Sequence, residues 1–569
     1  MYTDKIDLGA KPYFLSEKDI HWVNDTLNRM SEQDKLGQLF CLCSRNGDVE
    51  ELYEYLQVLK PGAIMVRPMP MEKLVEYKQV LDKQLEIPPL ISANLEKGGN
   101  GFIEEGTYFA SPLEAAATGE HAVQMAQRLG VICGREAEAL GVNWSFSPIV
   151  DIDYNFRNPI TNTRTFGNDP ERVKKMGVAY VQGVQGCGVA ATLKHFPGDG
   201  RDERDQHLVV SVNDFTCEQW DETYGAIYKA GIDAGAMSVM VGHIMQPEYQ
   251  KRLNPKLRDE ELLPGTLSRE LMQELLRGKL GFNGLIATDA TTMAGFNMLM
   301  PRYMAVPLAI ERGADMFLFT RNMAEDYKFM AEGYRSGILS KQRLQDAVTR
   351  ILATKAALGL HNDRRVIDVE AARQVVGCGE HLAWAKDCAE KSVTLVKAQK
   401  GVLPLSPEKY RKVLYFPIEA AKGVVYSVKE GVCSAFRDML SAEGFDVEEF
   451  VPCPNLEGNM RPYSEAMKYD LIIYLANIST KSNQTSVRIE WQQPMGANIP
   501  IYGTEIPTIF ISVENPYHLL DVPRVKTYIN TYSSHDAVLH ALLDKLMGRS
   551  EFSGVSPVDA FCGKWDTRL

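Results

Sequence analysis

The chain has 569 residues, several times the usual length of one domain, so we expect more than one hydrophobic core. It carries 62 Lys and Arg against 74 Asp and Glu, a formal net charge of −12 at pH 7, and it has no basic run. Such a chain is not expected to bind nucleic acid. Hydrophobic residues make up 45% and charged residues 24%, which excludes disordered, collagen-like and coiled-coil classes.

The first 20 residues show neither a basic segment followed by an apolar one nor any other targeting pattern, and no stretch of about 18 apolar residues occurs. We therefore expect no membrane association and a cytoplasmic location. The cysteines lack CxxC and zinc-site spacing and mostly stand in apolar runs, which predicts reduced, buried thiols and no metal or cofactor. They are Cys41, Cys43, Cys133, Cys187, Cys217, Cys378, Cys388, Cys433, Cys453 and Cys562.

Short apolar runs alternate with longer segments of helical periodicity from residue 36 to about 320, which predicts a parallel sheet with helical crossovers. The runs number eight, so we predict an α/β fold in which a (β/α)8 TIM-type barrel precedes a smaller α/β sandwich domain. The eight predicted strands lie within 36–43, 62–67, 89–94, 142–148, 190–196, 238–243, 285–290 and 316–321.

The pattern changes near residue 360, where a charged stretch without a strand begins. We predict a catalytic barrel at 1–360, a linker at 361–380 and the α/β sandwich at 381–569. Four apolar runs separated by helical segments predict the second sheet, at 412–418, 470–478, 508–516 and 525–532.

Active sites of barrels lie at the carboxyl ends of the strands, so polar residues there are the candidates. The fifth run leads into KHFPGDGRDERDQHL (194–208), whose proline and glycines favour a loop. The seventh run ends in Thr288-Asp289. A carboxylate at that position would be partly desolvated and could act as nucleophile or base; the alternative is a hydrogen-bonded rim residue.

The two segments form a pattern, KHFPG-x-G-x(4)-D-x-H at Lys194–His207 and GF-x-G-x-I-x-(S/T)-D at Gly281–Asp289, that resembles the bacterial β-N-acetylhexosaminidases of glycoside hydrolase family 3. Further motifs agree in order and cover nearly the whole chain. They are GVNWSFSPIVDI (141–152), RTFGNDPERV (164–173), SVMVGH (238–243), PGTLSRELMQELLRGKLGF (264–282), KSVTLVKAQKGVLPL (391–405) and YSSHDAVLHALLDKLMGRSEFSGVSPV (532–558).

The resemblance implies retaining hydrolysis, in which one group attacks the anomeric carbon and a second, about 5 Å away, serves as acid and then base. It places the nucleophile on Asp289 and the acid/base on His207, paired with Asp205. An imidazole suits both roles because its unperturbed pKa is about 6.5. Taken alone, His207 would be an ordinary surface loop histidine.

The resemblance also implies that Lys194, His195 and Arg164 hydrogen-bond the sugar, although an ion-pair network is the alternative. The remaining candidates for the substrate site are Asn94, Glu96, His243 and Met293. His243 is equally well explained as a hydrogen-bonded core histidine, and Met293 is more typical of core packing.

Several positions depart from the family pattern. The family's D-x-E-G-G segment reads Asn94-Leu95-Glu96-Lys97-Gly98-Gly99 here, so a charge is lost and a weaker or altered first subsite is expected. Gln206 stands where serine or threonine is usual, and Asp199 where histidine is frequent. We interpret the charged run at 201–204 as part of a solvated loop.

The leading hypothesis is a retaining exo-β-N-acetylglucosaminidase that cleaves terminal β-linked N-acetylglucosamine from cell-wall fragments. A neutral His207 would allow an anion such as phosphate to approach the glycosyl-enzyme, so a β-N-acetylglucosaminide phosphorylase is a variant of this hypothesis. A family 3 β-glucosidase or β-xylosidase with Glu490 as acid is a second alternative, and a non-catalytic carbohydrate-binding relic, suggested by Asn94, a third. A metal hydrolase is disfavoured because HxH and HExxH are missing. The expected partner is a small carbohydrate, and the sequence indicates no oligomeric state.

Overall fold

The computed structural model describes residues 6–44, 46–362, 366–419, 430–451, 463–479, 482–483, 485–492 and 496–569. The chain divides into two compact units. The first consists of Met1–Phe109, Ala126–Asn155 and Pro170–Leu382, and the second of Ala110–Met125, Phe156–Asp169 and Ala383–Leu569. Two segments from the N-terminal half of the sequence therefore belong to the second unit.

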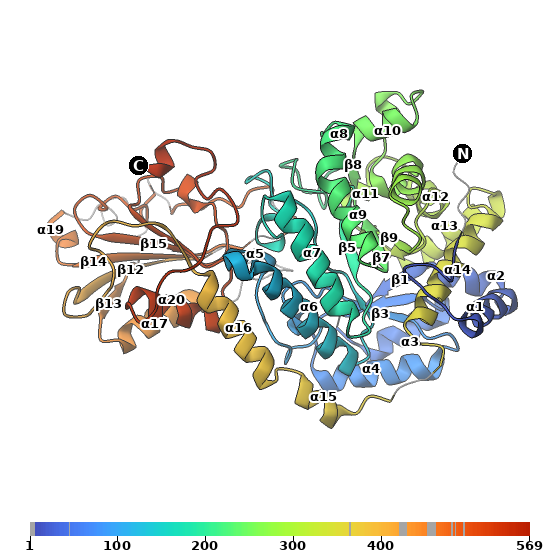
Figure 1. Cartoon of the computed structure of the whole chain (residues 1–569), viewed down its shortest axis with the longest axis horizontal. Coiled ribbons are helices and arrows are strands. Elements are labelled where there is room, and N and C mark those ends of the chain that lie inside the picture. The colour runs from blue at the N-terminus through green and yellow to red at the C-terminus, as the bar shows by residue number, and fades with distance from the viewer. Residues whose placement is uncertain are drawn as a thin grey trace. The chain divides into compact units, whose positions relative to one another are not determined.

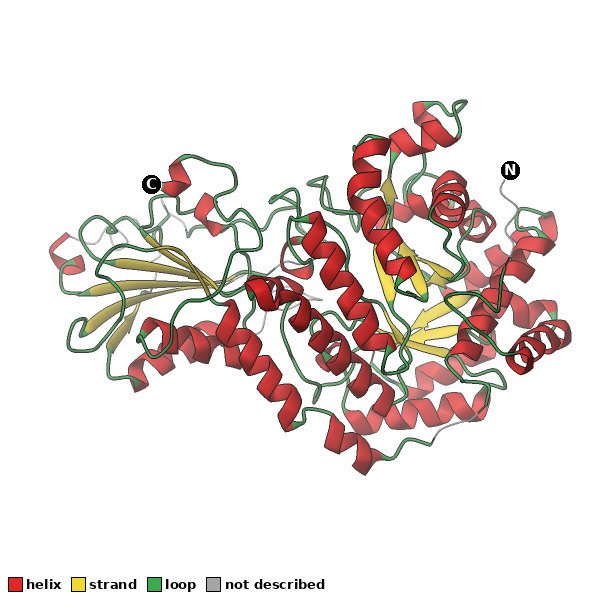
Figure 2. Cartoon of the chain, in the orientation of Figure 1, coloured by secondary structure: helices red, strands yellow, loops and turns green. Residues whose placement is uncertain are grey.

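The first unit is built on two parallel sheets (Figure 2). One has the strand order β10-β1-β2-β3-β4 and the other β5-β7-β9, while β6 and β8 form a separate parallel pair. The strands are β1 (Phe40–Cys43), β2 (Ala63–Met65), β3 (Leu90–Ala93), β4 (Trp144–Ser145), β5 (Thr192–Phe196), β6 (Ser211–Val212), β7 (Ser238–Val241), β8 (Ile244–Met245), β9 (Leu285–Thr288) and β10 (Phe317–Leu318). Each of the eight predicted runs contains one strand of the two larger sheets.

Isolated parallel bridges connect the two larger sheets to each other at both of their edges. Trp144 pairs with Ala190 and Ile149 with Lys194 between β4 and β5, and Ala287 pairs with Met316 between β9 and β10. The Trp144 indole donates to Thr192 Oγ1 at 2.9 Å and to Ser238 Oγ at 2.8 Å. The main strands therefore bury their polar side chains in mutual hydrogen bonds, as a dry interior requires.

Helices alternate with these strands along the chain, as the periodicity predicts. Several of them begin at serine, threonine, aspartate or asparagine caps, such as Ser16, whose side chain accepts from the amide of Asp19. The helices are α1 (Glu17–Arg29), α2 (Glu32–Gln38), α3 (Val49–Val58), α4 (Met71–Gln84), α6 (Ala122–Ala139), α7 (Pro170–Gln185), α8 (Cys217–Trp220), α9 (Ala226–Asp233), α10 (Pro247–Leu253), the π-helical η7 (Glu270–Lys279), α11 (Ala294–Asn297), α12 (Arg302–Glu311), α13 (Met323–Ser336), α14 (Lys341–Ala357), α15 (Val369–Val375) and α16 (Gly379–Ser392).

The second unit contains a six-stranded sheet of order β11-β16-β15-β14-β12-β13, parallel except for β11. The strands are β11 (Thr394–Lys397), β12 (Lys412–Glu419), β13 (Asp446–Glu449), β14 (Leu471–Asn477), β15 (Thr508–Ser512) and β16 (Thr527–Asn530). Its helices include α5 (Pro112–Ala117), α17 (Val432–Ala442), α19 (Tyr463–Ala466) and α20 (Asp536–Leu546). The α/β class with parallel sheets is confirmed in both units.

Both faces of this sheet are buried, which explains why its central strands are continuous apolar runs. On one face α16, α17 and α20 pack against the sheet (Figure 1). The opposite face carries a row of stacked rings with centroid distances of 4.5, 4.3, 5.7 and 5.7 Å along Phe450, Phe416, Tyr474, Phe510 and Tyr528. Such contacts add about 0.5–1.5 kcal/mol each to the burial of area.

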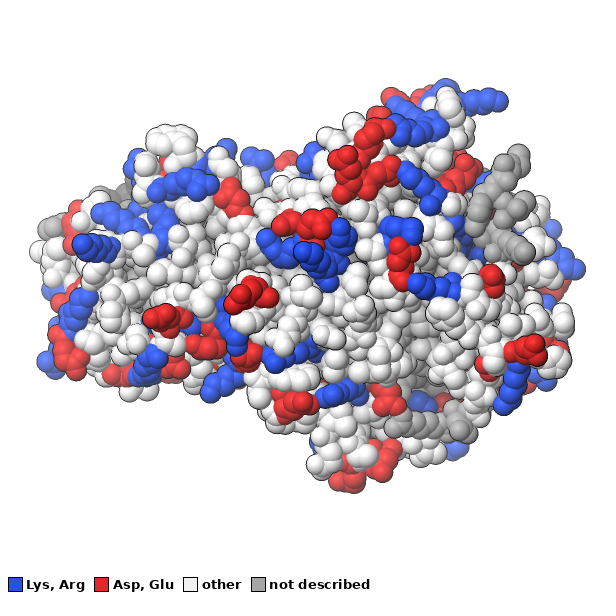
Figure 3. Space-filling model, in the orientation of Figure 1, with Lys and Arg blue, Asp and Glu red and all other residues white. Residues whose placement is uncertain are grey.

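Some elements were not predicted. The sequence of β13, Asp446–Glu449, is polar because the strand lies at the sheet edge, and α15 lies within the stretch expected to be a linker. The nine cysteines in the described ranges are thiols, and Cys453 lies outside the described residues. None of the described helices is long and apolar enough to span a bilayer. Lys, Arg, Asp and Glu are interspersed on the face drawn in Figure 3.

Candidate active site

The polar residues predicted to do chemistry in the first unit lie at the carboxyl ends of β3, β5, β7 and β9. Asp289 directly follows β9, and Lys194 and His195 are part of β5. His207 lies on the loop after β5 and is linked to the segment after β9, because the Ala294 amide donates to the His207 carbonyl at 3.0 Å. Residues from β5, its loop and β9 therefore meet at one end of the sheets.

Asp289 is a nearly buried carboxylate, 9% exposed. Its Oδ1 accepts a hydrogen bond from the Ala290 amide at 2.7 Å, and its Oδ2 lies 3.9 Å from Nε2 of His195. Burial by itself raises the pKa of this carboxyl group, but the imidazoles of His195, His243 and His207 and the Ala290 amide outweigh burial and hold it below its ordinary value. Asp289 is thus ionised at neutral pH in a site that water hardly reaches, as a nucleophile requires.

His207 and Asp205 form a hydrogen-bonded pair. Asp205 Oδ1 accepts from His207 Nδ1 at 2.7 Å and from the His207 amide at 2.8 Å, and Asp205 is buried. Because a carboxylate can only accept, Nδ1 carries the hydrogen, and Nε2 is the atom that can give or take a proton. The His207 side chain is 24% exposed, so a substrate can reach it.

His195 is held by a second carboxylate, Asp151. The Asp151 Oδ2 accepts from His195 Nδ1 at 2.7 Å, and its Oδ1 accepts from the His195 amide at 3.1 Å. Both side chains are buried. The ring is therefore fixed with Nε2 towards Asp289, where it can hydrogen-bond a ligand bound beside that carboxylate.

Lys194, Glu96 and Asn94 come together between the ends of β5 and β3. The Lys194 ammonium donates to Glu96 Oε1 at 2.9 Å and to Asn94 Oδ1 at 3.4 Å. Lys194 is buried, whereas Asn94 is exposed. The structure places three predicted sugar-binding side chains in one polar cluster, which serves either as a sugar site or as the ion-pair network named above.

His243 is fully buried with both ring nitrogens engaged. Its Nε2 donates to the Ala290 carbonyl at 3.0 Å, and its Nδ1 accepts from Thr266 Oγ1 at 2.9 Å. Burial lowers the pKa of His243, although the nearby Asp289 carboxylate acts in the opposite direction. His243 thus supports the backbone next to Asp289. Met293, also buried, is the N-cap residue of α11, and its carbonyl accepts from Asn297 Nδ2 at 2.7 Å.

Two candidates lie in the second unit. Arg164 ends a short helical turn, Asn162–Arg164, and Glu490 is exposed in a segment without regular structure. Their roles stay predictions.

Three residues of the site were not identified as functional from the sequence: Asp151, Asp199 and Gln206. Asp199 belongs to the same loop as the charged run interpreted above as solvated, but it is buried, whereas the loop tip at Glu203 and Arg204 is exposed. The acidic residue in the apolar run SPIVD (147–151) was the available signal for Asp151, because an uncompensated carboxylate is rare in such a run.

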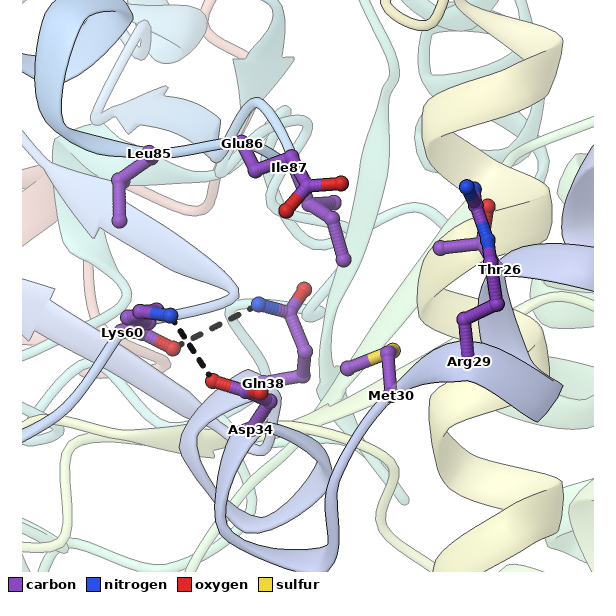
Figure 4. Close-up of a pocket in the computed structure, with 9 residues that line it drawn as sticks. All are labelled: Thr26, Arg29, Met30, Asp34, Gln38, Lys60, Leu85, Glu86 and Ile87. Atoms are coloured by element: carbon purple, nitrogen blue, oxygen red, sulfur yellow. Dashed lines mark hydrogen bonds and ion pairs between the residues drawn. The ribbon is translucent and has the colours of Figure 1, made fainter.

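A separate cavity of about 270 Å³ lies at the opposite, amino-terminal ends of β1 to β3 (Figure 4). Lys60 and Asp34 form an ion pair of 3.2 Å at this cavity, and the Gln38 amide donates to the Lys60 carbonyl. In the described part of the chain, no three His, Cys, Asp or Glu side chains are grouped so that they could hold a metal ion.

Comparisons with known proteins point to one family. The family model described as Glycosyl hydrolase family 3 N terminal domain matches residues 32–354. A relative from Cellulomonas fimi, described as a β-N-acetylglucosaminidase/β-glucosidase, is 48% identical over 566 residues, which are 99% of this chain and 100% of the relative. A β-hexosaminidase of Pseudomonas aeruginosa (strain LESB58) is 29% identical over 45% of this chain and 74% of its own length.

Solved structures are similar over nearly the whole chain. One described as the β-glucoside phosphorylase BglX has a TM-score of 0.92 and 45% identity and covers 99% of each chain. Another, a family 3 β-N-acetylglucosaminidase from Paenibacillus sp. str. FPU-7, has a TM-score of 0.79 and 23% identity and covers 94% of this chain and 100% of that one. At 23% identity, the similarity to the Paenibacillus enzyme shows a shared fold only.

Proposed function

Because the chain belongs to glycosyl hydrolase family 3, we propose that it is a retaining exo-β-N-acetylglucosaminidase that releases terminal β-linked N-acetylglucosamine from cell-wall fragments. The observation that carries this proposal is the presence, in one unit, of a buried ionised carboxylate and of an imidazole that is held by its own aspartate and acts electrostatically on that carboxylate. These are the two groups that double displacement needs.

In the first half of the reaction, Asp289 attacks the anomeric carbon. Its Oδ1 is held by the Ala290 amide, so Oδ2, facing His195, forms the new bond. The glycosidic C–O bond breaks, and protonated His207 gives its Nε2 proton to the departing oxygen. Asp205 stabilises the charged ring before the transfer and fixes its orientation after it.

In the second half, the glycosyl–Asp289 ester is cleaved. Neutral His207 takes a proton from water through Nε2, the oxygen attacks the anomeric carbon, and Asp289 leaves as a carboxylate. Two inversions give overall retention. His195 and Lys194, with Asn94 and Glu96, hold the sugar hydroxyls during both steps.

The proposal includes a closed eight-stranded barrel for the first unit. The sheets β10-β1-β2-β3-β4 and β5-β7-β9 together supply eight parallel strands, and the bridges Trp144–Ala190 and Ala287–Met316 join their edges. Asp289 and His207 would then share the carboxyl-terminal rim, where barrel enzymes carry their active sites.

Phosphorolysis of a β-glucoside or β-N-acetylglucosaminide is a second candidate, and two observations favour it. A carboxylate in the place of His207 would repel phosphate during the second half, whereas a neutral imidazole does not. In addition, the structure that is 45% identical over nearly the full length is described as a β-glucoside phosphorylase.

One experiment tests the sugar, the acceptor and the nucleophile together. Aryl β-N-acetylglucosaminide, β-glucoside, β-xyloside and β-N-acetylgalactosaminide are incubated with wild type and Asp289→Asn, with and without phosphate. We expect the N-acetylglucosaminide to be cleaved fastest and Asp289→Asn to lose turnover. Free sugar in phosphate buffer identifies a hydrolase, and sugar 1-phosphate a phosphorylase. A 2-fluoro glycoside that labels a residue other than Asp289 would refute the mechanism.

A further inference from the structure

Gln206 stands between the two members of the acid/base pair, Asp205 and His207, but its side chain has a different environment. It is completely buried. Its Oε1 accepts from the His243 amide at 2.8 Å, and its Nε2 donates to Asp199 Oδ2 at 3.3 Å. One side chain thus connects the catalytic loop to the end of β7 and to the beginning of the same loop.

Asp199 is itself firmly anchored. Its amide donates to Asp151 Oδ1 at 2.8 Å, and its carbonyl accepts from the Tyr224 hydroxyl at 2.6 Å. Asp151 is the carboxylate that orients His195. The hydrogen bond between Gln206 and Asp199 therefore links the loop that carries the acid/base to the residue that fixes His195.

The same glutamine is connected to the nucleophile through His243. The amide of His243 donates to Gln206, and its ring donates to the Ala290 carbonyl, one residue after Asp289. The chain also approaches closely at Gly295, where a Cβ would lie 2.5 Å from the Gln206 carbonyl oxygen. The catalytic loop is therefore fitted between β7 and α11 with little room for displacement.

We propose that Gln206 is a positioning residue whose two hydrogen bonds hold the Asp205–His207 pair in register with Asp289. This inference rests on the proposed acid/base role of His207. The length of the side chain is essential, since it spans from the loop backbone to both the β7 amide and Asp199. Serine or threonine at this position is too short to make both contacts.

Removing the side chain has a defined consequence for the reaction. It takes away the acceptor of the buried His243 amide and one donor to Asp199, and the loop gains freedom to move. Misplacement of a catalytic group by about 1 Å costs about 100-fold in rate. The loss should fall on the step that needs the proton of His207, because Asp289 keeps its own hydrogen bond to Ala290.

The test compares leaving groups, since a good leaving group departs without an acid. The kcat/KM for a 2,4-dinitrophenyl glycoside and for the phenyl glycoside of the same sugar is measured for wild type, Gln206→Ala, Gln206→Ser and the reference His207→Ala. Gln250→Ala is the matched control, because Gln250 is also buried and its side chain also makes two hydrogen bonds, both from Nε2, to the Leu263 carbonyl and to Ser268 Oγ. Melting temperatures are recorded for all variants.

We expect both Gln206 variants to lose about 10- to 100-fold on the phenyl glycoside and less than about 3-fold on the dinitrophenyl glycoside. Gln250→Ala should keep the wild-type ratio of the two substrates, whatever its melting temperature. Equal losses on both substrates, or no loss, would overturn the positioning role. If Gln206→Ala does not fold, the ratio of kcat/KM for the two glycosides is taken from Gln206→Ser.

The failure of the proposed function gives a different result. If His207→Ala loses the same factor of kcat/KM on the phenyl and the dinitrophenyl glycoside, His207 is not the acid, and the proposed mechanism is wrong. If His207→Ala loses more kcat/KM on the phenyl than on the dinitrophenyl glycoside and the Gln206 variants do not, only the positioning role of Gln206 is wrong. A double-mutant cycle of Gln206→Ala with Asp199→Asn adds a check, because directly bonded partners give losses that do not add.

Discussion

Lys355 on α14 is fully buried, and burial of its ammonium group lowers the free energy of unfolding. It has no exposed surface, and its ammonium donates to Oε1 of Gln38 at 2.6 Å, an amide that also lines the cavity of Figure 4. Burial lowers the pKa of Lys355 from 10.5 to about 7. Between these two values the unfolded chain binds the extra proton, so stability rises with pH in this window.

The difference between 10.5 and about 7, at about 1.4 kcal/mol per pH unit, corresponds to about 5 kcal/mol. This cost is complete below pH 7 and disappears above pH 10.5. Lys355→Met removes it but leaves the Gln38 carbonyl oxygen without this donor, which costs about 1–3 kcal/mol. We therefore expect a net stabilisation of about 2–4 kcal/mol at pH 7 that shrinks to zero or reverses by pH 9.5.

The assay is urea unfolding of wild type and Lys355→Met at pH 7 and 9.5, followed by far-UV circular dichroism. Lys545→Met is the control, because Lys545 is also buried but donates to Glu390 Oε1 at 2.9 Å and to the Glu551 carbonyl at 2.7 Å. It should destabilise the protein at both pH values. If Lys355→Met destabilises equally at pH 7 and 9.5, the reasoning from burial is wrong.

Three further predictions concern the site and the second unit. Asp151→Asn should lower kcat/KM by about 10- to 100-fold, because an amide has one acceptor oxygen for the three donors that Asp151 binds; an unchanged kcat/KM would contradict the role of His195. Gly295→Ala should lower activity because its Cβ would meet the Gln206 carbonyl oxygen, whereas Gly379→Ala, which opens into free space, should be neutral in the same assay. Burial lowers the pKa of His518 to about 3, so the second unit should lose about 2 kcal/mol between pH 6.5 and 5, and urea titrations of His518→Gln should lack that slope.

Local pattern in the sequence predicted the eight strands of the two larger sheets in the first unit and singled out candidate residues at their carboxyl ends. Each apolar run in the first 321 residues contains a strand, because a buried parallel strand must be apolar on both faces and is short enough to be read from neighbouring residues. Asp289 could be singled out as a lone carboxylate at the end of such a run. The edge strand β13 escaped prediction because half of its environment is solvent.

The tertiary structure decided which distant residues became partners. Asp151, Asp199 and Gln206 are separated by up to 55 residues, yet their hydrogen bonds join His195 to His243 and to the loop that carries His207. Likewise, Ala110–Met125 and Phe156–Asp169 belong to the second unit although the surrounding chain belongs to the first. Residue spacing along the chain predicts contacts within one helix or strand. A hydrogen bond between distant residues depends on where the fold places them, so these partners could not be predicted. The sequence therefore determined the buried strands of the two larger sheets in the first unit and the candidate reactive groups, and folding determined what holds those groups in place.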